Sequence, residues 1–131
     1  MRAMIQALLL VGLAAPAFAQ APLSAAEFER FATGRTLSYA LGGQTFGTER
    51  YLPGRRVVWA FEGDECQYGR WYPQDDQICF AYDGEEPQCW TFWEDGGGLA
   101  ARYMNHPDGG GLSEVTRATE PLHCPGPEVG V

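Results

Sequence analysis

The stretch QICFAYDGEEPQCW, residues 77–90, holds two apolar segments on either side of an acidic turn. Alternating apolar residues on both sides of a turn that contains Gly and Pro are typical of a β-hairpin. A hairpin centred between Asp83 and Glu86 places Cys79 directly opposite Cys89, and Cβ atoms of such pairs lie about 4.5–5.5 Å apart. The spacing matches neither a C-x-x-C redox pair nor paired zinc ligands. We therefore interpret Cys79 and Cys89 as a structural disulfide, because a small adjustment brings them into bonding range.

The alternating pattern of the hairpin continues over most of the chain. Turn signals such as Gly42 with Gly43, and Pro53 with Gly54, recur about every ten residues, as in antiparallel sandwiches and barrels. Strands are expected at 36–41, 44–51, 56–62, 66–72, 77–83, 88–94, 99–104 and 112–118. Because the connections are short, consecutive strands should pair in order. The prediction is a mainly β fold: an antiparallel meander of about eight strands over residues 36–118, closing into a small barrel or sandwich.

One helix is expected before the strands, in the N-terminal segment at 20–35. Ser24 and Glu27 have the spacing of a capping box, and Phe28 and Phe31 share a helix face. Gly34 stands where helices commonly end. The pattern predicts a helix over 24–33.

Aromatic and β-branched residues on the strands predict the centre of the core. These residues are Trp71, Ile78, Phe80, Trp90 and Phe92. The same cluster is open to another interpretation, the lining of a ligand pocket. We favour a packed core, because a barrel of about eight strands fills its interior with side chains.

The N-terminus has the three parts of a signal peptide. Residues 1–2 are a short positive start, a leucine-rich apolar run follows, and the A-F-A pattern at 17–19 suits signal peptidase. We expect cleavage after Ala19 and a periplasmic or secreted protein. The apolar run is shorter than the about 20 residues that span a bilayer, and we expect no membrane span in the mature chain.

An exported chain meets oxidising conditions, which favour disulfides. With Cys79 and Cys89 paired, Cys66 and Cys124 remain as a second pair that would pin the proline-rich tail at 119–131. Four cysteines allow three connectivities, so the sequence alone leaves this pairing open. The pairing also requires the tail to run back along the barrel for about 20 Å, close to its full extension.

The chain is acidic. Residues 20–131 contain eight Arg, no Lys and seventeen Asp or Glu, a formal net charge near −9. Such a charge repels phosphate backbones, so we expect no nucleic-acid partner. Alternate loops of a meander lie at one end, and six acids without any arginine fall in those loops. We call them the acidic pole: Asp64, Glu65, Asp83, Glu85, Glu86 and Asp108.

The acidic pole has two interpretations. A concentrated negative potential attracts a basic protein or a divalent cation. Alternatively, the acids only keep an exported protein soluble. The partner is therefore unknown from the sequence.

The sequence contains no familiar motif for catalysis or for cofactor binding. No G-x-S-x-G elbow surrounds a serine, and no G-x-G-x-x-G or Walker A motif occurs. His106 and Asp108 are better explained as a solvated turn than as metal ligands. The paired acids that a glycosidase would need all fall at turns. We therefore expect no catalytic residue, no metal site and no cofactor.

Four segments carry a resemblance: LSAAEFERFATGRT at 23–36, GRWY at 69–72, ICFAY at 78–82 and the following Cys89. They resemble a family of small exported bacterial proteins of unknown function with a tryptophan- and cysteine-containing β-meander. The resemblance extends from residue 23 to residue 93. It implies an exported location and a β-meander fold, and it implies no activity.

The expected function is that of a non-enzymatic binding or envelope-associated module. One alternative is an acidic inhibitor of a basic secreted hydrolase such as lysozyme, acting through the acidic pole. Another is an enzyme whose site the sequence does not reveal.

Overall fold

The computed structural model describes residue 12, residues 20–108 and residues 110–124. Within these residues the chain forms one helix and eight strands. Their bounds are α1 (Ala25–Ala32), β1 (Thr36–Leu41), β2 (Gln44–Leu52), β3 (Arg56–Phe61), β4 (Gln67–Gln74), β5 (Gln77–Tyr82), β6 (Gln88–Asp95), β7 (Gly98–Tyr103) and β8 (Ser113–Arg117). The expected signal peptide lies outside the described residues apart from Gly12, as does the tail from residue 125 onward.

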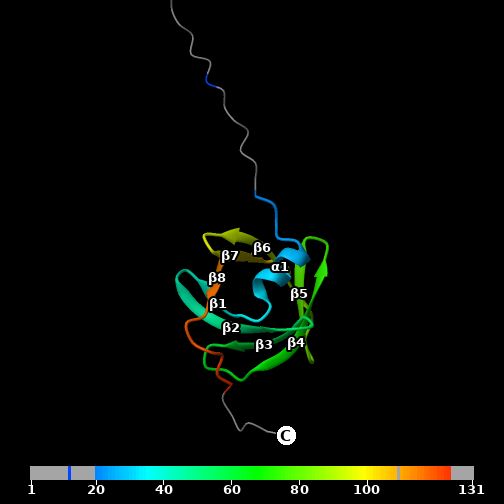
Figure 1. Ribbon diagram of the computed structural model, residues 1–131, viewed down its shortest axis with the longest axis vertical. Coiled ribbons are helices and arrows are strands. Elements are labelled where there is room, and N and C mark those ends of the chain that lie inside the picture. Colours follow the sequence, from blue (N-terminus) through cyan, green and yellow to red (C-terminus); the bar gives the residue numbers. More distant parts are fainter. Residues whose placement is uncertain (1–11, 13–19, 109, 125–131) are drawn as a thin grey trace, which may run out of the picture.

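The strands form a closed antiparallel barrel. Each strand pairs with the next in sequence, and β1 also pairs with β8, from Leu37 opposite Arg117 to Ala40 opposite Glu114. The predicted meander of eight strands is confirmed, and the pairing of β1 with β8 makes it a barrel. Figure 1 looks nearly along the barrel axis, with the strands surrounding α1.

Helix α1 begins at a complete capping box. The Ser24 hydroxyl accepts a hydrogen bond from the Glu27 backbone N–H at 3.2 Å, and the Glu27 carboxylate accepts one from the Ser24 N–H at 3.0 Å. These two bonds satisfy N–H groups that the first helical turn leaves free. The helix therefore starts at the residues that the sequence predicts.

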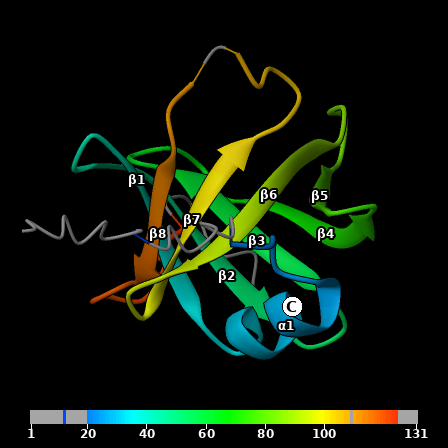
Figure 2. The ribbon, with the colours of Figure 1, turned by 90° about the horizontal axis from the view of Figure 1, so that it is seen from above.

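Helix α1 covers one end of the barrel. Its Phe28 is fully buried, and its ring packs against four rings from inside the barrel: Tyr51, Trp71, Phe80 and Phe92. The Leu23 N–H donates to the Phe92 carbonyl at 2.8 Å, which ties the segment before the helix to β6. Figure 2 shows α1 at one end of the strands and the loop between β7 and β8 at the other.

Four of the five residues expected at the centre of the core are buried, and the fifth, Trp90, packs against this core from its edge. Trp71, Ile78, Phe80 and Phe92 are at most 4% exposed. Trp90 is only half-buried. It lies near the start of β6, next to the barrel end away from α1, and its ring packs against Tyr39 and Tyr103.

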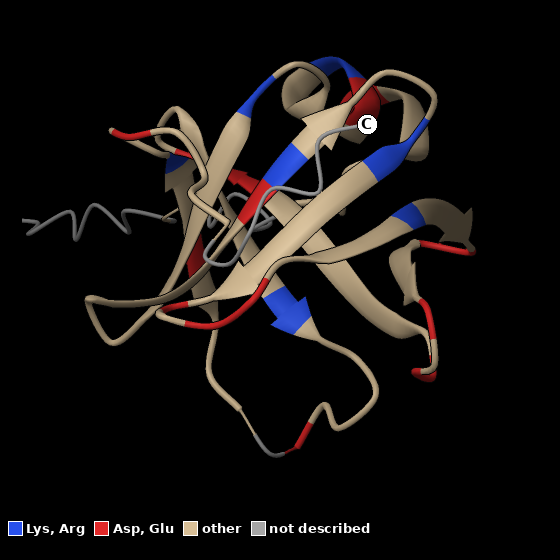
Figure 3. Ribbon diagram, turned by 90° about the horizontal axis from the view of Figure 1, so that it is seen from below, with Lys and Arg blue, Asp and Glu red and all other residues tan. Residues whose placement is uncertain are grey.

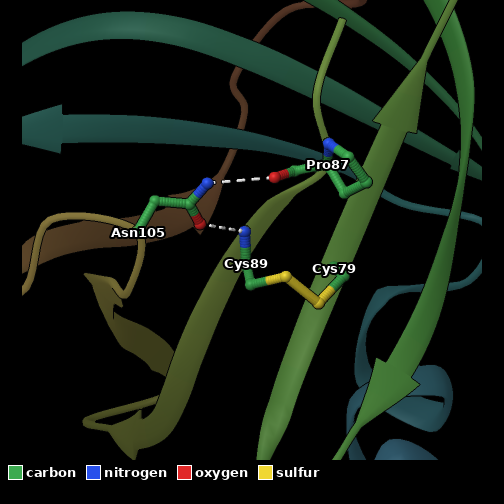
Figure 4. Close-up of a disulfide and its surroundings, with 4 residues drawn as sticks. All are labelled: Cys79, Pro87, Cys89 and Asn105. Atoms are coloured by element: carbon green, nitrogen blue, oxygen red, sulfur yellow. Dashed lines mark hydrogen bonds between the residues drawn. A yellow bond between two sulfur atoms is a disulfide. The ribbon is translucent and has the colours of Figure 1, made fainter.

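Both disulfides are present. Cys79 and Cys89 lie directly opposite each other on β5 and β6, on the barrel's outer face. Figure 4 shows the Asn105 side chain, from the loop after β7, beside Cys89 and Pro87. Its Oδ1 accepts from the Cys89 N–H at 2.9 Å, and its Nδ2 donates to the Pro87 carbonyl at 3.0 Å. The side chain thereby bonds the backbone at the start of β6.

Cys66 and Cys124 form the second disulfide, which holds the described part of the tail against the barrel. Strand β8 ends near α1, whereas Cys66 lies in the loop between β3 and β4 at the opposite end. The tail therefore runs back along the outside of the barrel. It lines a groove together with Ser38, Thr48 and Ala60 of the first three strands.

Candidate functional site: the open end of the barrel

No helix of the described residues covers the end of the barrel opposite α1, and we call it the open end. The loops at 42–43, 62–66, 83–87 and 104–112 surround it. All six residues of the acidic pole lie in three of these loops and are exposed. Figure 3 shows acidic segments on loops on the side away from the helix. The exposed large hydrophobic residues of the described chain lie at the same end: Leu41, Phe61, Tyr68 and Leu112.

A small pocket leads from the open end into the barrel. Its cavity measures about 20 Å³. The lining residues come from five strands: Tyr39, Glu49, Trp59, Phe80, Tyr82, Gln88 and Trp90. Trp59, Gln88 and Trp90 are half-buried, while the other four are buried. The pocket therefore passes from a partly exposed aromatic rim to a buried floor.

The acidic residue on this floor is Glu49, whose side chain is almost completely buried (1% exposed). It lies on β2 between Leu37 of β1 and Trp59 of β3, both apolar cross-strand neighbours. The Tyr82 hydroxyl donates to its carboxyl oxygens at 2.8 Å and 3.1 Å. Burial raises the pKa of Glu49 well above its ordinary value, and the Tyr82 hydrogen bond lowers it by less. The carboxyl is therefore held toward its protonated, uncharged form.

Three tyrosines surround this carboxyl. The hydroxyls of Tyr39 and Tyr51 are hydrogen-bonded to each other, and Tyr82 bonds to Glu49. Burial is the main cause that raises the pKa of all three hydroxyls, and the nearby Glu49 raises the pKa of each further. The tyrosines therefore remain uncharged donors and acceptors around the carboxyl.

Two glycines make room for the rings that line the pocket. A Cβ atom on Gly47 would overlap the indole ring of Trp59, and one on Gly69 would overlap the Ala81 carbonyl oxygen and lie 2.7 Å from Cδ1 of Tyr82. Any side chain at these positions would displace the two rings. A glycine inside a strand often marks such a close approach.

An apolar groove adjoins the pocket at the open end. It measures about 420 Å³. Its walls come from two segments that are far apart in the sequence, at 41–46 and 90–113. The lining residues are Leu41, Gln44, Phe46, Trp90, Tyr103, Gly110, Gly111 and Ser113. Trp90 lines both hollows, so the buried pocket and the apolar groove adjoin at this residue.

The acidic pole is spread over three loops. Among the described residues, no three His, Cys, Asp or Glu side chains are grouped so that they could hold a metal ion. His106, considered above as a metal-ligand candidate, places its ring against Tyr103 with centroids 6.0 Å apart. The divalent-cation interpretation of the acidic pole thus gains no ligand set from the described part of the chain.

Glu49 is not among the residues that the sequence analysis singled out, because the acids named there all lie at turns. A signal for it exists in the stretch GTERY at 47–51. Residues two apart share a face of a strand, which puts Glu49 on the same face as Gly47 and the buried Tyr51. An acid on the core-facing side of a predicted strand is a candidate functional residue.

Comparison of the chain with protein-family models, with curated proteins and with solved structures finds no match. In the part of the chain that the structure describes, no helix has the length and apolar character to cross a membrane.

Proposed function

We propose that the protein is an exported, non-enzymatic binding module that holds its ligand at the open end of the barrel. The observation that carries this proposal is the buried carboxyl of Glu49 on the floor of an aromatic pocket. Small eight-stranded barrels can hold one small ligand in this way. One end is covered by α1, so a ligand has to enter between the loops of the other end.

The position of Glu49 supports a functional role. Burying a carboxyl among apolar neighbours costs stability, and groups with strongly shifted pKa values cluster at functional sites. Among the described residues that line the pocket, Glu49 is the single carboxyl, and no Ser, Cys, Lys or His accompanies it. This composition supplies a binding contact and lacks a nucleophile with its base, which favours binding over catalysis.

The surface around the pocket supports a positively charged ligand. The acidic pole carries six carboxylates, and its loops contain no arginine. Such a field attracts cations and speeds their encounter. The exposed Leu41, Phe61, Tyr68 and Leu112 add apolar contact area.

The same surface favours a second candidate function, inhibition of a basic secreted hydrolase. Acidic loops and exposed apolar side chains around one end offer a surface for a large basic partner. In this case the partner covers the whole open end, and the loops contribute more to binding than the pocket does.

Removing charge from the acidic pole is expected to slow the association of positively charged ligands. The variant changes Asp64 to Asn and Glu65, Glu85 and Glu86 to Gln. We expect a lower association rate and a flatter salt dependence, with dissociation nearly unchanged. Stopped-flow tryptophan fluorescence with hexylammonium and with lysozyme measures both rates.

The matched control removes four exposed acids near the covered end: Asp75, Asp76, Glu94 and Asp95. It is expected to associate as the unchanged protein does. Equal rates for the two quadruple variants would contradict a role for the acidic pole and leave solubility as its explanation. Fast binding of lysozyme without any binding of hexylammonium would favour the inhibitor function.

We also propose that the protein is exported and that residues 1–19 are removed, in keeping with the family that residues 23–93 resemble. The two disulfides support an oxidising compartment. The intact mass of protein recovered from the periplasm or medium is expected to match a chain beginning at Gln20. Full-length chain found in the cytosol would contradict the proposal.

A further inference from the structure

We propose that the ligand carries a primary ammonium group that enters the pocket and forms an ion pair with Glu49, while its apolar part lies in the adjacent groove. Glu49 releases its proton to solvent as the ammonium group binds. This inference rests on the proposed function, because it assumes that the ligand binds at the open end.

The sign of the ligand charge follows from the pocket lining. The lining contains one carboxyl and no Arg, Lys or His. The rings of Trp59, Trp90 and Phe80 add negative faces that attract a cation. An anionic ligand would face Glu49 and the acidic pole with no compensating positive charge.

The size of the cavity selects a primary ammonium group. A cavity needs about 10–15 Å³ to hold one water molecule. The measured 20 Å³ therefore accepts one group of that size. An ammonium group is comparably small, whereas a trimethylammonium group is several times larger. The pocket therefore discriminates between two cations of equal charge.

The hydrogen-bonding groups in the pocket also suit a primary ammonium group. Such a group has three N–H donors and no acceptor. In the free protein, only the Tyr82 hydroxyl bonds to the Glu49 carboxyl, so acceptor sites remain on its two oxygens. The oxygens of Tyr82 and Tyr39 provide further acceptor sites on the same floor.

The groove next to the pocket selects the rest of the ligand. Phe46, Tyr103 and Leu41 line it, and Trp90 lines both the groove and the pocket. A hydrocarbon chain attached to the ammonium group would leave the pocket beside Trp90 and enter this groove. Each CH₂ group of such a chain that is buried in the groove is expected to raise the affinity about fourfold.

Proton release follows from the surroundings of Glu49. It faces Leu37 and Tyr39 of β1, Trp59 of β3, and Tyr82 of β5, and Tyr51 is on its own strand. None of these carries a positive charge, and burial raises the Glu49 pKa, which favours the protonated carboxyl. An incoming ammonium group supplies the positive charge that stabilises the carboxylate. One positive charge enters and one proton leaves, so the net charge of the pocket is unchanged.

Isothermal titration calorimetry with hexylammonium tests this inference. Titrations in two buffers of different ionisation enthalpy count the protons released. We expect close to one proton per ligand, and an affinity that rises about tenfold per pH unit while free Glu49 is protonated. Hexyltrimethylammonium and hexanoate are expected to bind at least tenfold more weakly than hexylammonium.

The Glu49→Gln variant separates the ammonium contact from the groove. It is expected to release no proton and, at pH 8, to lose at least tenfold more affinity for hexylammonium than for hexanol. If the variant does not fold, the inference is tested by the unchanged protein alone, and hexylammonium binding without proton release would contradict it. Proton release that persists in a folded Glu49→Gln variant would overturn the role of Glu49.

The outcomes also distinguish this inference from the proposed function. Binding is located by the indole N–H signals of Trp59 and Trp90 in NMR spectra. If hexanol shifts these signals as strongly as hexylammonium and no proton is released, the ammonium inference fails while binding at the open end stands. If no small ligand and no basic protein shifts them, both fail.

Discussion

Replacing Phe28 with alanine is expected to lower the free energy of unfolding by about 3–5 kcal/mol, the usual cost of truncating a buried phenylalanine. Phe28 is fully buried, and its ring lies 4.6 Å from Phe92 and 5.2 Å from Trp71, centroid to centroid. Its removal would leave a cavity where α1 meets the barrel. Urea unfolding followed by tryptophan fluorescence measures the loss.

The control for Phe28 is the same substitution at Phe31. This residue lies on the same helix and is only half-buried, so its truncation should cost clearly less. Since small domains have only about 5–15 kcal/mol of stability, Phe28→Leu provides a milder variant that keeps the protein folded. Equal costs for Phe28→Ala and Phe31→Ala would show that α1 does not close the barrel through Phe28.

Replacing Glu49 with glutamine is expected to stabilise the protein increasingly as the pH rises. Burial raises the pKa of Glu49 in the folded state, so between pH 4.5 and that raised value the folded protein holds a proton that the unfolded chain has lost. The contribution of Glu49 to stability therefore falls with pH, by up to about 1.4 kcal/mol per pH unit. Glutamine keeps an oxygen that accepts from Tyr82 and has no proton to lose.

Urea unfolding of both proteins between pH 5 and pH 8 measures this effect. The stability difference between Glu49→Gln and the unchanged protein should grow steadily over that range. Glu114→Gln, an exposed change on β8, serves as the control and should give a small difference that does not grow with pH. A constant difference for Glu49→Gln would mean that the carboxyl is ionised in the folded protein.

The ligand titrations and the unfolding experiments test the same property of Glu49, the preference of its buried carboxyl for the uncharged form. Without a ligand, the buried carboxyl lowers the stability of the protein above pH 4.5, because burial disfavours its charged form. With a cation in the pocket, the same carboxyl gains a partner and the cost is reduced. Sites whose function needs a strained or desolvated group commonly carry such a stability cost.

The sequence by itself determined the local structure. The bounds of the strands follow from alternation and turn residues, and the start of α1 follows from the Ser24 and Glu27 capping box. The opposition of Cys79 and Cys89 follows from the centre of their hairpin. Each of these features depends on residues that are close in the chain, where spacing translates directly into geometry.

Only the tertiary structure decided which end of the barrel is covered and what the other end contains. Residues two apart on a strand share a face, but alternation does not show how deep along the barrel each one lies. The position of α1 makes Trp71 part of the core and leaves Trp90 at the rim of a pocket. The environment of Glu49 likewise depends on Tyr82, which lies 33 residues away in the chain and bonds to it across the barrel interior. Contacts between distant segments appear only when β1 pairs with β8 and closes the sheet, because closure brings their side chains into one interior.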